Sequence, residues 1–155
     1  MNRRALTLIP LLFLVLWLPL SAQEKQQNPE AATGAVTFDE HDAAQVLGVL
    51  RNALESYSPL LFLSAFDAGK MNSYLTFQDQ VEAYFTQYES FRVSYHILQT
   101  SQENNRGVIL ADFQIENEMR GGGRASRRQS QLRFELERGP KGWKIVDMDP
   151  RGFFF

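Results

Sequence analysis

The chain has 155 residues, with 16 Lys and Arg, 18 Asp and Glu, and a net charge of −2. Its apolar fraction of 44% is typical of a folded domain and too high for a disordered chain. The absence of cysteine excludes disulfides and thiolate chemistry, and the near-neutral charge argues against a dedicated nucleic-acid binder.

The first 22 residues have the pattern of a secretory signal peptide. Arg3 and Arg4 precede an apolar run that ends at Leu20, and the small residues Ser21 and Ala22 follow. This run of about 16 residues is shorter than the roughly 20 that a membrane-spanning helix needs. We expect cleavage after Ala22, a periplasmic or secreted protein, and membrane contact only during export. The alternative is an uncleaved membrane anchor.

Residues 23–36 are rich in Gln, Glu, Asn and small residues and have no apolar period. Such a composition buries too little surface to offset the entropy of ordering. We interpret these residues as a flexible linker. A domain over residues 37–150 and an aromatic segment over residues 151–155 follow it.

Three helical segments are predicted at the start of the domain. Thr37 and Glu40 have the spacing of a capping box. An apolar face follows at helical spacing, formed by Leu47, Leu50, Leu54 and Tyr57. Ser58 and Pro59 are typical of the N-cap and first residue of a second, short helix over residues 60–66. A third helix is predicted from Thr76, with a buried stripe of Phe77, Val81, Tyr84, Phe85 and Tyr88.

The apolar period then changes to two, which predicts strands. Turn signals separate four alternating segments, at residues 91–98, 108–119, 128–137 and 143–148. Their expected inner faces are Phe91, Val93, Tyr95 and Ile97; Ile109, Ala111, Phe113 and Ile115; Ser130, Leu132, Phe134 and Leu136; and Trp143 and Ile145, with Asp147 at the rim. The sequence therefore predicts an α+β domain, in which the helices pack on one face of a curved antiparallel sheet of about four to five strands.

This element order and the segment from Gly142 to Asp149 resemble the NTF2-like superfamily, which includes SnoaL-like and ketosteroid-isomerase-like proteins. The segment, Gly-Trp-Lys-Ile-Val-Asp-Met-Asp, looks like the last strand of that cone-shaped fold. The resemblance covers residues 38–150. It implies a conical pocket between sheet and helices, and frequent dimers through the outer sheet face. The superfamily contains enzymes, ligand binders and assembly domains, so the fold alone does not name the function.

The predicted pocket is apolar and phenolic. Its expected lining residues are Tyr57, Tyr84, Tyr88, Tyr95, Phe113, Phe134 and Trp143. Asp147 with Tyr95 is the candidate acid–base pair, because a carboxylate beside a phenol can transfer a proton. The other interpretation of Asp147 is a cap or ion pair at the end of a strand. By alternation, His96 and Asp112 are expected on the outer face of the sheet.

Two further segments carry candidate contacts. Four arginines surround three glycines between the second and third strands, namely Arg120, Arg124, Arg127 and Arg128. Guanidinium groups there could bind an anionic partner, or they could keep a hairpin tip soluble. The segment Phe153, Phe154 and Phe155 is costly to leave in water. It is expected to plug the cone, cover the helices or join a dimer.

The function favoured by these features is an exported, non-catalytic module that binds a small apolar ligand or mediates protein assembly, with a homodimer through the outer sheet face. The alternatives are an isomerase-like enzyme that uses Asp147 and Tyr95, and an envelope protein that binds an anionic partner through the Arg120–Arg128 loop. The sequence has no metal-ligand spacing, phosphate-binding loop or dinucleotide fingerprint. We therefore expect no metal, no cofactor and no nucleic-acid partner.

Overall fold

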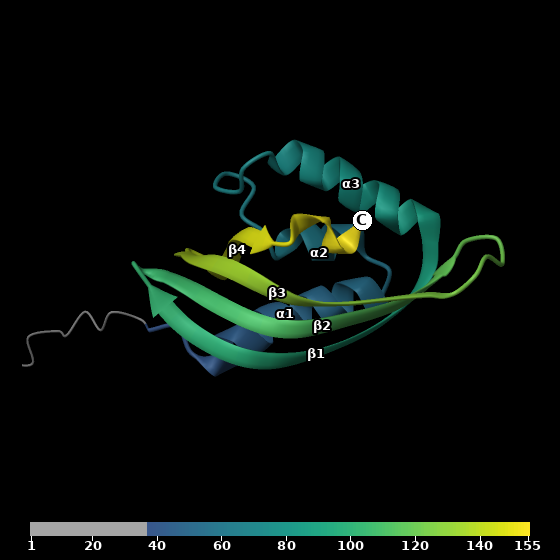
Figure 1. The fold of residues 1–155 in the computed structure, drawn as a ribbon. Coiled ribbons are helices and arrows are strands. Elements are labelled where there is room, and N and C mark those ends of the chain that lie inside the picture. Colours follow the sequence, from purple (N-terminus) through teal and green to yellow (C-terminus); the bar gives the residue numbers. More distant parts are fainter. Residues whose placement is uncertain (1–36) are drawn as a thin grey trace, which may run out of the picture. The chain divides into compact units, whose positions relative to one another are not determined.

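The computed structural model describes residues 37–155, so the predicted signal peptide and linker lie outside the described residues. Three helices precede four strands and a final 3-10 turn. Helices and sheet are arranged in two layers (Figure 1). Within residues 37–155, no helix combines the length and apolar character needed to cross a bilayer.

Helix α1 (Glu40–Glu55) begins with a capping box two residues later than predicted. The Asp39 carboxylate accepts from the Asp42 N–H at 2.9 Å, and the Asp42 carboxylate accepts from the Asp39 N–H at 3.4 Å. Two carboxylates thus supply the reciprocal bonds that the sequence analysis assigned to Thr37 and Glu40. Phe38 is buried just before this cap, with its ring 4.9 Å from that of Trp143.

The next two helices differ in how well the sequence predicts their ends. Helix α2 (Pro59–Ser64) has the expected Ser58 cap, whose hydroxyl accepts from the Leu61 N–H. Helix α3 (Tyr74–Gln87) begins two residues before the predicted Thr76. Its N-cap Ser73 is in the left-handed region at φ 56° and makes no side-chain cap, so the usual sequence signal is missing.

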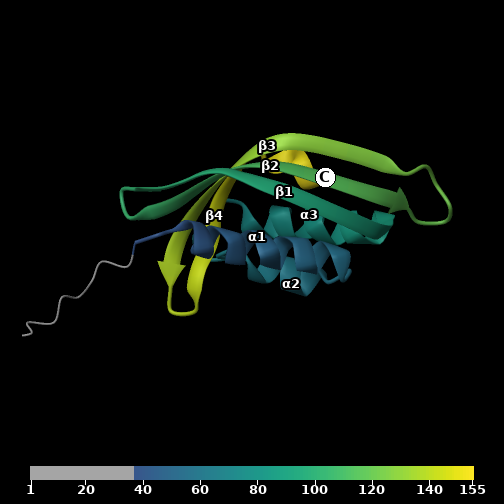
Figure 2. The same ribbon diagram turned by 90° about the horizontal axis from the view of Figure 1, so that it is seen from below.

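Strands β1 (Tyr88–Glu103), β2 (Arg106–Met119), β3 (Ser126–Gly139) and β4 (Gly142–Asp149) form one antiparallel sheet in that order. The count of four is the lower end of the expected range. Asn104 and Asn105 both have positive φ in the turn between β1 and β2. Figure 2 shows the curved sheet from below, with the β3–β4 hairpin crossing the N-terminal end of α1.

The predicted inner faces of β1, β2 and β3 are confirmed, but β4 contains an irregularity that alternation does not reveal. Glu135 pairs with Asp147 and Leu136 pairs with Ile145, which leaves Val146 as an extra residue. Such a bulge moves the following side chains to the opposite face. Met148 is therefore buried, whereas the sequence analysis expected Asp147 on the inner face.

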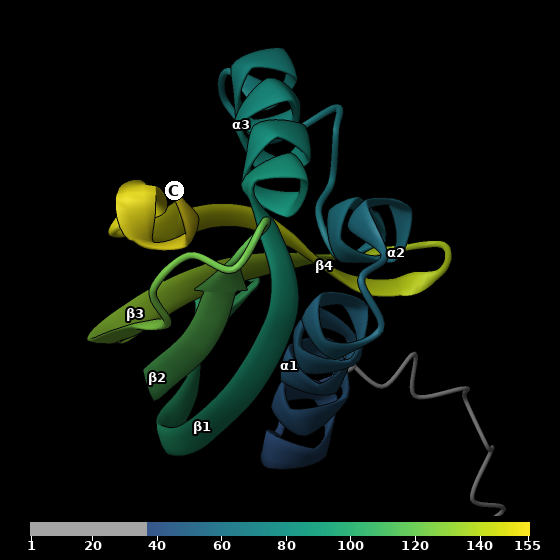
Figure 3. The ribbon, with the colours of Figure 1, turned by 90° about the vertical axis from the view of Figure 1, so that its right-hand side faces the viewer.

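The chain after β4 turns back onto the helical side of the sheet. The 3-10 turn η1 (Arg151–Phe154) lies between α3 and β3 in the end-on view (Figure 3). Phe153 and Phe154 are both buried and belong to the same hydrophobic core as the inner faces of the strands. The aromatic segment is thus part of the interior of the domain.

Candidate functional site

The predicted pocket residues do come together inside the cone. Tyr84, Tyr88, Phe113, Phe134 and Trp143 belong to the core, and Tyr57 and Tyr95 are partly buried against it. Their side chains come from all four strands, from α3 and from the turn that follows α1, and they share one hydrophobic core. The structure thus gathers the residues that the sequence analysis assigned to a ligand pocket.

The chain's own aromatic segment fills much of this interior. Phe154 is fully buried, with its ring 5.1 Å from Phe62, 5.9 Å from Phe113 and 5.2 Å from Phe153. Phe155 is only partly buried and lies against α3. The sequence analysis left three positions open for this segment: inside the cone, over the helices or in a dimer contact. In the structure, Phe153 and Phe154 lie inside the cone.

Arg128, on β3, binds the aromatic segment through hydrogen bonds. Its guanidinium donates to the main-chain oxygens of Phe155 at 2.7 Å and of Phe153 at 3.3 Å, and to the Tyr88 hydroxyl at 3.5 Å. It also lies 5.8 Å from the centre of the Tyr84 ring. Arg128 is half-buried, and the hydrogen bonds of its guanidinium go to these three oxygens.

The other arginines of the predicted anion-binding loop separate into different environments. Arg120 donates to the Tyr57 hydroxyl and lies over that ring, 5.3 Å from its centre. Arg127 points to the outer face, where it contacts Gln114 and lies 3.9 Å from the carboxylate of Glu116. Arg124 is exposed. The four guanidinium groups therefore do not converge on one exposed site.

A buried amide completes the polar part of the interior. Asn117 is 2% exposed and donates to the Tyr84 hydroxyl at 2.8 Å, while the Ser126 hydroxyl donates to the Asn117 oxygen. Burial raises the pKa of Tyr84 to about 12, so this phenol stays protonated at neutral pH. The sequence analysis missed Asn117, although it continues the inward alternation of Phe113 and Ile115.

The candidate acid–base pair is not brought together. Asp147 is on β4 and Tyr95 on β1, at the two opposite edges of the sheet. The Asp147 carboxylate binds Arg151 at 2.6 Å and its side chain is 46% exposed. The Tyr95 hydroxyl instead lies 3.5 Å from the Ala44 carbonyl oxygen. Direct proton transfer between the two groups is therefore not possible in this arrangement.

The outer face of the sheet carries His96 and Asp112, as alternation predicted. They are cross-strand neighbours on β1 and β2 and, with Ser94, Gln114 and others, line an open hollow of about 320 Å³. No hydrogen bond joins His96 to Asp112 in the described chain. This polar face is the surface to which the sequence analysis assigned a homodimer.

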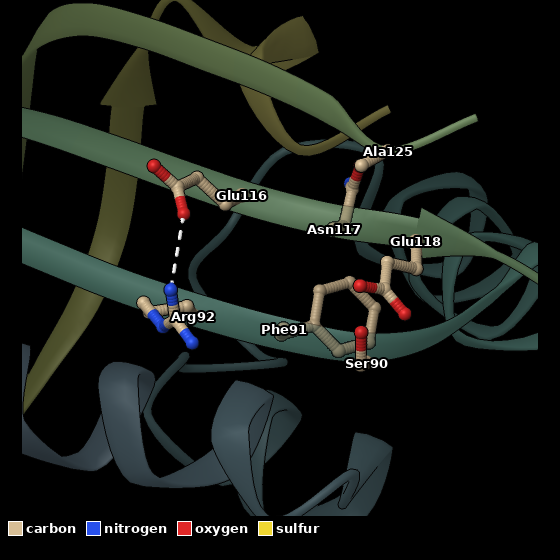
Figure 4. Close-up of a pocket in the computed structure, with 7 residues that line it drawn as sticks. All are labelled: Ser90, Phe91, Arg92, Glu116, Asn117, Glu118 and Ala125. Atoms are coloured by element: carbon tan, nitrogen blue, oxygen red, sulfur yellow. Dashed lines mark ion pairs between the residues drawn. The ribbon is translucent and has the colours of Figure 1, made fainter.

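A second hollow, of about 180 Å³, lies between β1 and β2 close to Ala125, just before β3 (Figure 4). Arg92 and Glu116 form an ion pair at 3.6 Å across its rim. Asn117 lies at its base but is already bound to Tyr84 and Ser126. Across residues 37–155, no three His, Cys, Asp or Glu side chains are grouped to hold a metal ion.

No protein-family model matches this chain, and no curated protein sequence matches it significantly. Solved structures are similar in fold. A conserved protein from Planctomyces limnophilus is 12% identical, with a TM-score of 0.62 over 71% of this chain and 92% of that chain. An NTF2-like superfamily protein from Salmonella enterica serovar Typhimurium is 10% identical, with a TM-score of 0.61 over 70% of this chain and 86% of that one.

A ketosteroid isomerase-like protein from Erwinia carotovora atroseptica is 12% identical, with a TM-score of 0.57 over 72% of this chain and 95% of that chain. At such identities the likeness concerns the fold alone. Residues 37–155 therefore have the α+β fold of NTF2-like and ketosteroid-isomerase-like proteins, as the resemblance in the sequence implied.

Proposed function

We propose that this chain is an exported, non-catalytic NTF2-like module that binds a small apolar ligand inside its cone. One observation carries the proposal: Asn117 is the only non-aromatic polar side chain buried among residues 37–155. An interior of aliphatic, aromatic and phenolic groups is suited to apolar molecules and offers few groups for chemistry. Export is proposed from the signal-peptide pattern of residues 1–22 alone.

The same interior argues against the isomerase-like alternative. General acid–base catalysis needs a group that titrates near the working pH and reaches the substrate. Tyr84, with a pKa of about 12, is a hydrogen-bond donor rather than a base at neutral pH. Asp147 is outside the cone and bound to Arg151. Because Asp147 and Tyr95 are separated, the isomerase-like alternative lacks the acid–base pair on which it depended.

Protein assembly is the second candidate function, and the buried aromatic segment favours it. Phe153 and Phe154 occupy space that a ligand would need, and a filled cone leaves the outer surfaces to make contacts. The homodimer through the outer sheet face belongs to this candidate. Ser94, His96, Asp112 and Gln114 on that face are polar, so the contact would be wet rather than apolar.

The anionic-partner alternative has less support. Arg120 and Arg128 bind oxygens of the chain itself, and Arg127 is 3.9 Å from Glu116. A surface that reads a large anion needs several free cations on one side. Arg124 alone does not supply that arrangement.

Native mass spectrometry of the chain, purified from the exported fraction without refolding, tests the proposal. It reads the cleavage point, the number of subunits and any retained small molecule in one experiment. A mass that begins after Ala22 and carries a reproducible small apolar adduct is the expected result. A ligand-free dimer would support assembly in its place, and a chain retained in the cytoplasm would contradict export.

A further inference from the structure

We propose that a hollow between α1 and the β3–β4 hairpin binds a small aliphatic monocarboxylate, whose carboxylate pairs with Arg138 and accepts from the indole N–H of Trp143. The hollow has a volume of about 310 Å³, which is within the range of small-molecule sites. Phe153 and Phe154 do not line it, so binding there does not require residues 151–155 to move. The inference concerns a second site and goes beyond the function proposed above.

The observation that points to a ligand is the indole of Trp143, which lines this hollow. Trp143 is 8% exposed, and its Nε1–H is the one buried side-chain polar group of residues 37–155 that has no hydrogen-bond partner. A buried donor without an acceptor destabilises the folded state, and such a group in a folded protein calls for a partner outside the chain. An acceptor oxygen bound in the hollow would supply the missing hydrogen bond.

Two cations of the hairpin, Arg138 and Lys141, give the hollow its charge. Arg138 is the cross-strand partner of Trp143, and its guanidinium lies 5.9 Å from the centre of the indole ring. In the described part of the chain, neither cation pairs with a carboxylate, whereas Lys144 donates to the Ser64 carbonyl oxygen. A guanidinium forms strong, charge-assisted hydrogen bonds with a carboxylate. The hairpin therefore offers two neighbouring donors to one carboxylate group.

The opposite wall, formed by α1, determines the rest of the ligand. Val46 and Val49 line this wall, and their methyl groups favour an aliphatic chain over a polar one. Asp42 also lines the hollow, and its negative charge disfavours a second charge on the ligand. A single carboxylate on a short aliphatic chain satisfies both conditions, whereas a phosphate dianion satisfies neither.

NMR of the ¹⁵N-labelled chain, purified without refolding, reads the indole N–H directly. The probes are hexanoate and hexanamide, which have the same chain and differ in charge. We expect hexanoate to shift the Trp143 Nε1–H signal downfield, as a new hydrogen bond does, and to bind roughly tenfold more tightly than the amide. Trp143→Phe assigns the signal, because the sequence has one other tryptophan, Trp17.

Arg138→Gln should remove the preference for the carboxylate, whereas Arg124→Gln, at an exposed arginine between β2 and β3, should leave it intact. Equal binding of the two probes, or equal loss with both substitutions, overturns the inference. An indole signal that neither probe moves also overturns it, as does tighter binding of inorganic phosphate than of hexanoate. The ligand of the cone is tested separately by native mass spectrometry, so these outcomes leave the proposed function standing.

Discussion

The two ends of the sheet use arginine in opposite ways. At the end formed by the β1–β2 and β3–β4 turns, Arg106 binds Glu137 at 2.8 Å and Glu135 at 3.1 Å, and Arg133 binds Glu103 at 3.2 Å. At the β2–β3 end, Arg120 and Arg128 bind phenol and main-chain oxygens. Arg106 and Arg133 thus pair with side-chain carboxylates at the first end, whereas Arg120 and Arg128 bind phenol and main-chain oxygens at the second.

This difference changes what each guanidinium is expected to contribute to stability. The ion pairs of Arg106 are exposed, whereas Arg128 is half-buried beside an aromatic interior, where electrostatic interactions are stronger than in water. The comparison predicts that Arg128 stabilises the domain more than Arg106 does.

The largest expected effect comes from Phe154→Ala in the interior of the domain. Phe154 is fully buried, and removal of a buried phenyl ring costs about 3–5 kcal/mol through lost contacts and a cavity. Urea unfolding should show a loss of this size. Phe155→Ala, at a partly buried ring, is the matched control and should cost clearly less. Equal losses would mean that Phe154 is not packed inside the cone.

Arg128→Gln tests the comparison between the two ends directly. Hydrogen bonds that involve a charged group contribute about 1.5–3 kcal/mol, so we expect a loss in that range, reduced by partial exposure. Arg106→Gln removes exposed ion pairs and should cost at most about 1 kcal/mol. Chemical denaturation of both variants gives the ranking. A larger loss of stability for Arg106→Gln than for Arg128→Gln would contradict this ranking of the two arginines.

Asn117→Ala probes the buried amide behind Arg128. It leaves the Tyr84 hydroxyl without its buried donor, which costs about 1–2 kcal/mol. A double-mutant cycle with Tyr84→Phe isolates the bond between the two side chains. The two substitutions together should cost less than the sum of their separate effects. Strict additivity would show that the amide and the phenol act independently.

The smallest expected effect is a pH dependence at the ion-paired end. The hydrogen bond from Lys70, and after it that from Arg106, lowers the pKa of Glu137. A carboxyl whose pKa is lower in the folded state adds stability above its ordinary pKa, and this stability is lost as pH falls through the lowered pKa. Glu137→Gln should therefore flatten the acid limb of Tm against pH. Glu118→Gln, an exposed residue of β2, should leave that limb unchanged.

The inner faces of the first three strands follow from sequence alternation because the predicted inner residues lie where the pairing is regular, including Phe91 to Ile97 of β1, between its two register shifts. The inner face of the fourth strand could not be predicted in this way. The bulge at Val146 appears only in the pairing with β3 and leaves no mark in the residue types of the strand. This single insertion changes the face on which Asp147 lies, while its distance from Tyr95 follows from the strand order. Local pattern therefore predicts a strand and its face only as far as the register is uninterrupted.

The candidate site divides in the same way. The aromatic lining could be predicted, because helical and strand periods place Tyr84, Phe113 and Phe134 on inner faces. The partners of Arg120 and Arg128 could not, because those contacts join residues far apart in the sequence. The segment Phe153–Phe155 was expected to be buried somewhere, but only the packed interior selects the cone over a dimer contact.

The most direct test of this account is a two-dimensional nuclear Overhauser spectrum of the purified chain with labelled phenylalanine. The account predicts cross-peaks from the Phe154 ring to the rings of Phe62 and Phe113 in the free chain. Their absence would contradict the claim that Phe154 fills the interior of the cone.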